Sequence, residues 1–165
     1  MAKKDQYRLK VLLELREQAK REAERFLGEC LTALKEEEDR LAEMEDELTR
    51  MVTHREIRVR DYSQKQMRGD MSAQAMISAN SFVETLKEQE EAQKSAIVGQ
   101  KVVITQREEE AQRARDELII ANQELKALEK HREKWEEKVK RERSLKEEET
   151  LDELAQTIFL NKEKE

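Results

Sequence analysis

Apolar residues recur along the chain in alternating steps of three and four positions, in two long series. The positions between them hold mostly Glu, Lys, Arg, Gln and Ala, which all favour a helical backbone. A repeat of this kind is typical of a left-handed coiled coil, because it keeps one apolar seam facing a partner helix. The first series is Ala23, Leu27, Cys30, Leu34, Glu37, Leu41, Met44, Leu48 and Met51, with Glu37 as its one polar member, and the second is Ala114, Leu118, Ala121, Leu125, Leu128, Arg132, Trp135 and Val139.

One segment between the two series, 67–72, is a credible helix breaker. Gly69 can adopt the left-handed conformation that ends helices, and Asp70 or Ser72 can cap the helix that follows. The pattern therefore predicts an all-α chain, with a first helix over about 5–67, a turn over about 68–71 and a second helix over about 72–162.

Two long helices joined by one short turn favour an antiparallel coiled-coil hairpin, formed by a single domain, 1–165. Folding about the turn places opposite each other residues whose numbers sum to about 139. Apolar residues then meet at three separate levels, which favours the hairpin over a parallel dimer of longer unbroken helices. The three levels are Ile57 with Phe82, Leu41 with Ile97 and Val98, and Val11 and Leu12 with Leu128.

The predicted seam is polar in its middle. Gln89, Gln93 and Gln100 fall between Leu86 and Val103, where the register calls for apolar side chains. Polar seam residues lower stability but can fix the register of a coiled coil. Two interpretations follow: either this part of the hairpin is soft, or the glutamines form hydrogen bonds across the seam.

Composition supports a helical coiled coil and argues against a thick globular core. Charged residues make up 44% of the chain and aromatic residues only 4%, and proline is absent. The formal net charge of −6 argues against a general nucleic-acid binder, which is usually basic. The single Cys30 excludes an internal disulfide framework and fits a reducing compartment. With no long apolar run and no apolar leader at Met1, we expect a cytoplasmic protein without membrane insertion.

No residue pattern here predicts an enzyme, a metal site or a bound cofactor. The two histidines, His54 and His131, lie far apart in the hairpin register, so surface positions are the better interpretation. Cys30 belongs to the apolar series and is expected to be a buried small side chain. The three glycines are isolated and form no phosphate-binding loop. Acidic pairs are frequent, but carboxylates on solvated helices lack the burial that tunes them for acid–base catalysis.

Charge is distributed in bands along the chain. Residues 1–25 carry eight Lys or Arg against five acids, and residues 129–146 carry the same numbers. Residues 29–47, by contrast, carry nine acids against two bases. A charged band is usually only a solvated face, but the hairpin register brings both basic bands to the end that holds the termini. This coincidence favours contact between that end and an acidic partner.

Both ends of the chain and the turn resemble the FliJ/YscO family, the central-stalk proteins of bacterial type III secretion, flagellar or injectisome. The opening segment 6–30 reads QYRLKVLLELREQAKREAERFLGEC and is similar to the first helix of that family. The later segments 131–139, HREKWEEKV, and 146–155, KEEETLDELA, are similar to its C-terminal part. The turn sequence RGDMS at 68–72 falls where that family turns.

The resemblance implies a non-enzymatic stalk or escort component of a protein export apparatus. Such proteins bind a hexameric export ATPase, link it to the export gate protein, and interact with export chaperones. They therefore act at the cytoplasmic face of the inner membrane through their partners. The family is described as contacting the gate with an aromatic residue followed four positions later by an aliphatic one. That pattern matches Phe82 and Leu86 here, although Gln89 and Gln93 depart from it further on.

The hairpin register leaves the segment beyond Trp135 without a partner in the first helix. Because it is basic and then carries an apolar stripe, we expect it to bind the ATPase; a frayed tail is the other interpretation. The candidate ATPase-binding residues are Lys138, Lys140, Arg141, Arg143, Lys146, Leu151, Leu154 and Ile158.

Two functions of other classes fit parts of the pattern. A structural spacer or cytoskeletal rod would show the same heptads, but it should self-associate and needs no projecting tail. A membrane-surface helix would need a broad apolar face, whereas the apolar stripe here is narrow and its surroundings carry mixed charge. Binding to the ATPase separates the first of these from the stalk, and liposome flotation separates the second.

Overall fold

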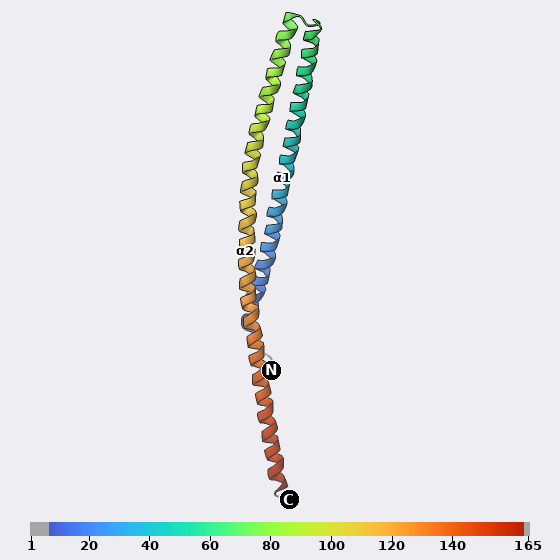
Figure 1. Ribbon diagram of the computed structural model, residues 1–165. Helices are drawn as coiled ribbons and strands as arrows, with labels where there is room; N and C mark the ends of the chain where they lie inside the picture. The colour runs from blue at the N-terminus through green and yellow to red at the C-terminus, as the bar shows by residue number, and fades with distance from the viewer. Residues whose placement is uncertain (1–6, 164–165) are drawn as a thin grey trace. The chain divides into compact units, whose positions relative to one another are not determined.

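The computed structural model describes residues 7–163, and two helices account for nearly all of them. Helix α1 spans Lys10–Met67 and helix α2 spans Ala73–Lys162. Within residues 7–163 there is no strand. The two helices run antiparallel on either side of one turn (Figure 1). The predicted all-α hairpin is therefore confirmed.

Helix α1 begins later than the sequence pattern predicts. The expected start near Asp5 lies outside the described residues, but Tyr7 to Leu9 precede the helix without forming part of it. The amide of Lys10 donates a hydrogen bond to the carbonyl oxygen of Tyr7 over 3.1 Å, which closes a turn ahead of the first helical residue.

Gly69 and Ser72 shape the turn between the helices: Gly69 ends α1 and Ser72 caps α2. Gly69 has a φ of 71°, in the left-handed region. Its amide donates to the Gln66 carbonyl, and the amide of Asp70 donates to the Lys65 carbonyl over 3.0 Å. These two hydrogen bonds satisfy the last carbonyls of α1 in a Schellman motif. Ser72, rather than Asp70, caps α2, because its Oγ accepts a hydrogen bond from the amide of Ala75.

The turn supports a stability prediction with an internal control. Replacing Gly69 with alanine should lower the free energy of unfolding by about 1 kcal/mol, because an L side chain is strained in the left-handed region. Gly99 lies inside α2, and a Cβ added there would meet no atom within 4 Å. Replacing Gly99 with alanine should therefore raise that free energy by roughly 0.5–1 kcal/mol. Urea unfolding measures both changes, and equal shifts in the same direction would contradict this account of the turn.

The chain divides into two compact units, and each unit contains one segment of α1 and one segment of α2. One unit is Phe26–Arg115, which contains the turn. Its buried core includes Cys30, Ala111 and Ala114, with Leu27 packed against them. Cys30 is thus a buried side chain of the seam, as predicted.

Polar side chains hold the middle of this unit together. The amide nitrogen of Gln93 donates to the backbone carbonyl of Met44 over 3.0 Å. The amide nitrogen of Gln100 donates to the carbonyl of Glu37 over 3.0 Å and to its carboxylate over 2.6 Å. The residue numbers sum to 137 in both pairs, close to the predicted register. Of the two interpretations of the polar seam, hydrogen bonding across it is confirmed for these two glutamines.

The third predicted glutamine is not the one that enters the seam. Gln89 is exposed, whereas Glu90 beside it is only 4% exposed. Counting from Ile97 in steps of four and three passes through Gln93 and then Glu90, which places Gln89 one position outside the seam. The guanidinium Nε of Arg55 donates to Glu90 over 2.6 Å and neutralises it. This hydrogen bond also raises the pKa of Arg55.

Two of the predicted apolar levels are less buried than expected in this unit. Ile97 is buried, but its neighbour Val98 is 64% exposed and points away from the seam. Ile57 and Phe82 are also exposed. The register agrees with the prediction to within two residues, but the seam admits only about one residue per turn of each helix, so adjacent apolar residues remain outside it.

The described part of the other unit consists of residues 7–25 and 116–163. Leu13 and Leu125 are its buried residues, and Arg16 pairs with Glu124 over 2.5 Å. Val11 and Leu12, predicted to face Leu128, are exposed, because Leu13 takes the seam position. Ahead of α1, the Tyr7 hydroxyl lies 2.7 Å from Nδ1 of His131.

Candidate functional site

The C-terminal part of α2 continues past the beginning of α1 within its unit (Figure 1). The Tyr7 ring packs on Trp135, with 5.3 Å between ring centroids. Val139 is half-buried, but every residue from 141 to 163 is exposed. We call residues 141–163 the tail. As the sequence predicted, the tail is helical, as far as Lys162, and has no covering partner in the described part of the chain.

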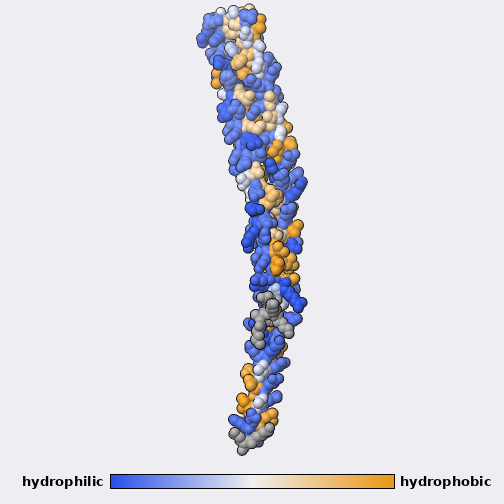
Figure 2. Space-filling view, turned by 180° about the vertical axis from the view of Figure 1, so that it is seen from behind, coloured by the Kyte–Doolittle hydropathy of each residue, from blue (hydrophilic) through white to orange (hydrophobic). Residues whose placement is uncertain are grey.

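Three apolar residues of the tail share one side of the helix. Leu151, Leu154 and Ile158 are separated by three and four positions, so they lie one above the other. Their side chains are 65%, 54% and 59% exposed, and Phe159 beside them is 63% exposed. Figure 2 shows apolar side chains near this end of α2 among hydrophilic ones. We call Leu151, Leu154 and Ile158 the tail stripe.

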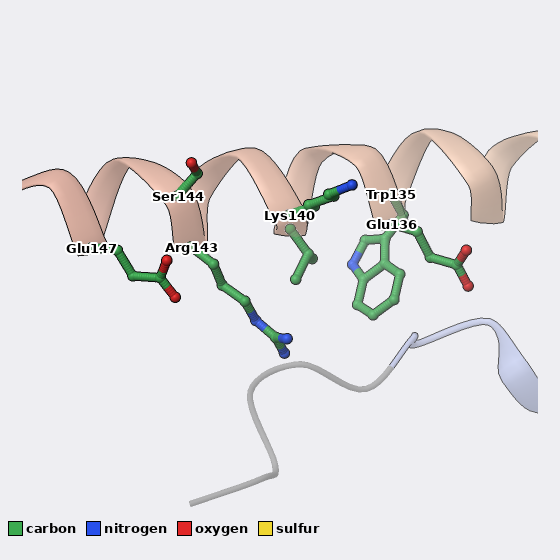
Figure 3. Close-up of a pocket in the computed structure, with 7 residues that line it drawn as sticks. Trp135, Glu136, Lys140, Arg143, Ser144 and Glu147 are labelled. Carbon is green, nitrogen blue, oxygen red and sulfur yellow. The ribbon is translucent and has the colours of Figure 1, made fainter.

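Only some of the predicted basic residues lie on the side of the tail stripe. Counting back from Leu151 by four, four and three positions leads to Glu147, Arg143 and Lys140. These three residues line one shallow hollow together with Trp135 (Figure 3). Figure 3 shows the Arg143 guanidinium and the Trp135 indole on the same side of the helix. The remaining candidates, Lys138, Arg141 and Lys146, are exposed on other sides of α2.

The tail stripe is not a continuation of the coiled-coil seam of α2. Extending the seam beyond Val139 in steps of three and four leads to Glu142, Lys146, Glu149 and Glu153, which are all charged and exposed. The coiled-coil pattern therefore stops near Val139, and a second apolar pattern with a different phase begins at Leu151. The sequence contains this signal, but it becomes clear only once the seam positions are known.

The predicted gate-binding pair lies in the other compact unit. Phe82 is 40% exposed, so its ring is available to a partner. Leu86 is half-buried in the seam and lines a surface groove with Met51, His54 and Gln89. The two residues therefore differ in their surroundings: Phe82 presents an apolar surface, whereas Leu86 mainly packs between the helices.

Within residues 7–163, no group of three His, Cys, Asp or Glu side chains is arranged to hold a metal ion. None of the described helical segments is long and apolar enough to cross a membrane.

Comparison with known proteins gives a consistent result. The sequence model of the YscO-like protein family matches residues 4–165. Among solved structures, the chain is similar to CT670 from Chlamydia trachomatis, described as a candidate YscO homolog, with a TM-score of 0.80 and 23% sequence identity. That match covers 97% of this chain and 99% of CT670, and at this identity it supports the fold. Among curated proteins, no sequence matches the chain.

Proposed function

Since this chain belongs to the YscO-like protein family and is thus related to type III secretion, we propose that it is a non-enzymatic stalk component of a type III export apparatus. In this role it binds the hexameric export ATPase with the tail and connects it to the export gate protein. Export chaperones are a further class of expected partner. The chain then acts at the cytoplasmic face of the inner membrane through these partners, without entering the membrane.

The observation that carries the ATPase contact is the uncovered tail stripe. A side chain such as leucine or isoleucine gains about 1.5–3 kcal/mol when it is fully buried, so three exposed ones on a stable helix favour a partner. An amphipathic helix that presents residues in steps of three and four can occupy an apolar groove. Lys140 and Arg143 on the same side would then contact acidic groups at the entrance of that groove.

Co-purification of the full chain with the export ATPase of the same secretion system tests this function. We expect a complex whose affinity falls as salt is raised, because Lys138, Arg141 and Lys146 contribute long-range attraction and salt screens it. A chain that instead forms only homo-oligomers, with the ATPase remaining free, would be a structural spacer and would refute the proposal.

The proposed gate contact rests on Phe82. Replacing Phe82 with alanine should weaken binding to the soluble domain of the gate protein by about 10- to 100-fold, because exposed aromatic residues often dominate interface energies. Leu86 is a poor test position, since it packs in the seam and its loss would also destabilise the hairpin. Isothermal titration calorimetry measures the affinity.

Ile77 provides the matched control for this measurement. It lies on the same helix in the same unit and is 63% exposed. The Ile77→Ala variant should bind the gate domain normally, and both variants should bind the ATPase normally. Equal losses for the two variants would show that Phe82 has no specific role.

A further inference from the structure

The charge around the tail stripe is opposite to that of the helix segment before it. Residues 138–146 carry five Lys or Arg against one acid. Residues 147–161 carry five acids and no Lys or Arg. We call these five acids the acidic belt: Glu147, Glu148, Glu149, Asp152 and Glu153. None of them has an ion-pair partner within residues 7–163.

The acidic belt surrounds the tail stripe closely. Glu147 lies on the side of the stripe itself, four positions before Leu151. Glu148 and Asp152 are four positions apart and therefore form one edge of the stripe. Any partner that covers Leu151, Leu154 and Ile158 must come close to these carboxylates, and it then removes them partly from water. Such a partner is favoured only if it supplies positive charge, since unpaired carboxylates are costly to desolvate.

The phase of the tail stripe indicates where this partner binds. Leu151 follows the last seam residue, Val139, by twelve positions, which turns it about a third of a turn away from the seam at 100° per residue. A helix that extended the existing seam would instead cover Glu142, Lys146, Glu149 and Glu153. The partner of the tail stripe therefore approaches a side of α2 that the hairpin does not use.

From these observations we infer that the tail stripe docks an amphipathic helix of a partner protein, whose apolar face is edged with Lys and Arg. This inference adds the chemistry of the binding surface to the proposed function. It rests on the proposed function only for the identity of the partner protein. The docking surface then has two zones of opposite charge: Lys140 and Arg143 meet acidic groups, and the stripe within the acidic belt meets basic ones. A partner that is uniformly acidic fits the first zone but is repelled by the second.

Two other occupants fit this surface less well. A second copy of the chain would bring five more acids and no base from its own residues 147–161. An anionic membrane surface would be repelled by the acidic belt. The spacing of three and four positions over two turns also matches a helix better than an extended strand.

Two synthetic amphipathic peptides with the same leucine stripe, one edged with Lys and the other with Glu, test the inference on the full chain. By fluorescence anisotropy, the Lys-edged peptide should bind at least about tenfold more tightly than the Glu-edged one. The Leu154→Ala/Ile158→Ala variant should lose this binding. The Glu148→Gln/Asp152→Asn variant should weaken it by about threefold or more.

The control variant neutralises two acids elsewhere. Glu36 and Glu38 are exposed on α1 in the strongly acidic band, so Glu36→Gln/Glu38→Gln should leave peptide binding unchanged. Equal binding of both peptides would overturn the inference, as would an equal loss in the control variant or self-association that depends on the stripe.

Failure of the proposed function would look different from failure of the inference. A chain that distinguishes the two peptides but does not bind the export ATPase supports the docking surface and refutes the ATPase as its partner. A chain that binds the ATPase but does not distinguish the peptides refutes the docking chemistry alone.

Discussion

Replacing Leu154 and Ile158 together with alanine should weaken binding of the chain to the export ATPase by about 100- to 1000-fold. Each substitution removes three carbon atoms from the tail stripe, and each buried methylene contributes about 0.8 kcal/mol. Because Leu154 and Ile158 are only 54% and 59% exposed, a little over half of that contribution is gained on binding, about 3 kcal/mol in total. Alanine keeps the helical propensity of the tail, so circular dichroism should detect no loss of helix. Equilibrium binding to the purified ATPase measures the effect.

Leu145 offers a control of the same residue type and equal exposure. Its side chain is 54% exposed, as is that of Leu154, but it lies on a different side of α2. The Leu145→Ala variant should bind the ATPase almost as the unchanged chain does. If it loses as much affinity as the Leu154→Ala/Ile158→Ala variant, general apolarity of the tail rather than the stripe is responsible.

The largest expected effect on stability comes from the buried ion pair. Replacing Arg55 with methionine leaves the Glu90 carboxylate, whose side chain is 6% exposed, without its partner. Removing one member of such a pair is strongly destabilising, because the other charge stays buried. We expect the melting temperature to fall by roughly 5 °C or more. Thermal unfolding followed by circular dichroism gives the value.

Two further variants separate the ion pair from other effects. The Arg55→Met/Glu90→Leu variant should recover most of the stability, since an apolar pair can replace a buried charged one. Lys87 forms an exposed pair with Glu84, and replacing it with methionine should change little. A Lys87→Met effect as large as that of Arg55→Met would show that burial of Glu90 is not the cause.

The sequence predicts the helical architecture well because its information is local and repeated. Steps of three and four positions define each seam, and Gly69 alone supplies the left-handed residue that the turn requires. Once the turn is fixed, the length of each arm sets the register. The hydrogen bonds of Gln93 and Gln100 across the seam agree with that register to within two residues.

The predictions that are wrong concern single positions, where either of two adjacent residues could occupy the seam. Gln89 is a more plausible seam residue than Glu90 when the helix is considered alone, because a buried carboxylate is unfavourable without a partner. Its partner, Arg55, lies 35 residues earlier in the chain. The predictions for Val98 and Leu12 are wrong for a similar reason, since each lies next to a seam residue of comparable hydrophobicity, Ile97 in one case and Leu13 in the other.

The candidate site was predictable in part. The exposed tail and its stripe follow from the register, because the first helix is too short to cover them. The grouping of Lys140 and Arg143 with the stripe follows from the helical spacing, and the separation of Lys138, Arg141 and Lys146 from it does too. The partners themselves leave no such pattern in one chain, so the ATPase and gate contacts stay predictions.

The most direct test of the ATPase contact is a truncation that removes residues 147–165. The described residues of this segment, 147–163, are all exposed, so the hairpin should keep its helical content and melting temperature. Titrated against the purified export ATPase, the truncated chain should neither bind measurably nor change the rate of ATP hydrolysis, whereas the full chain should do both. Binding and stimulation equal to those of the full chain would contradict the assignment of the tail as the ATPase contact.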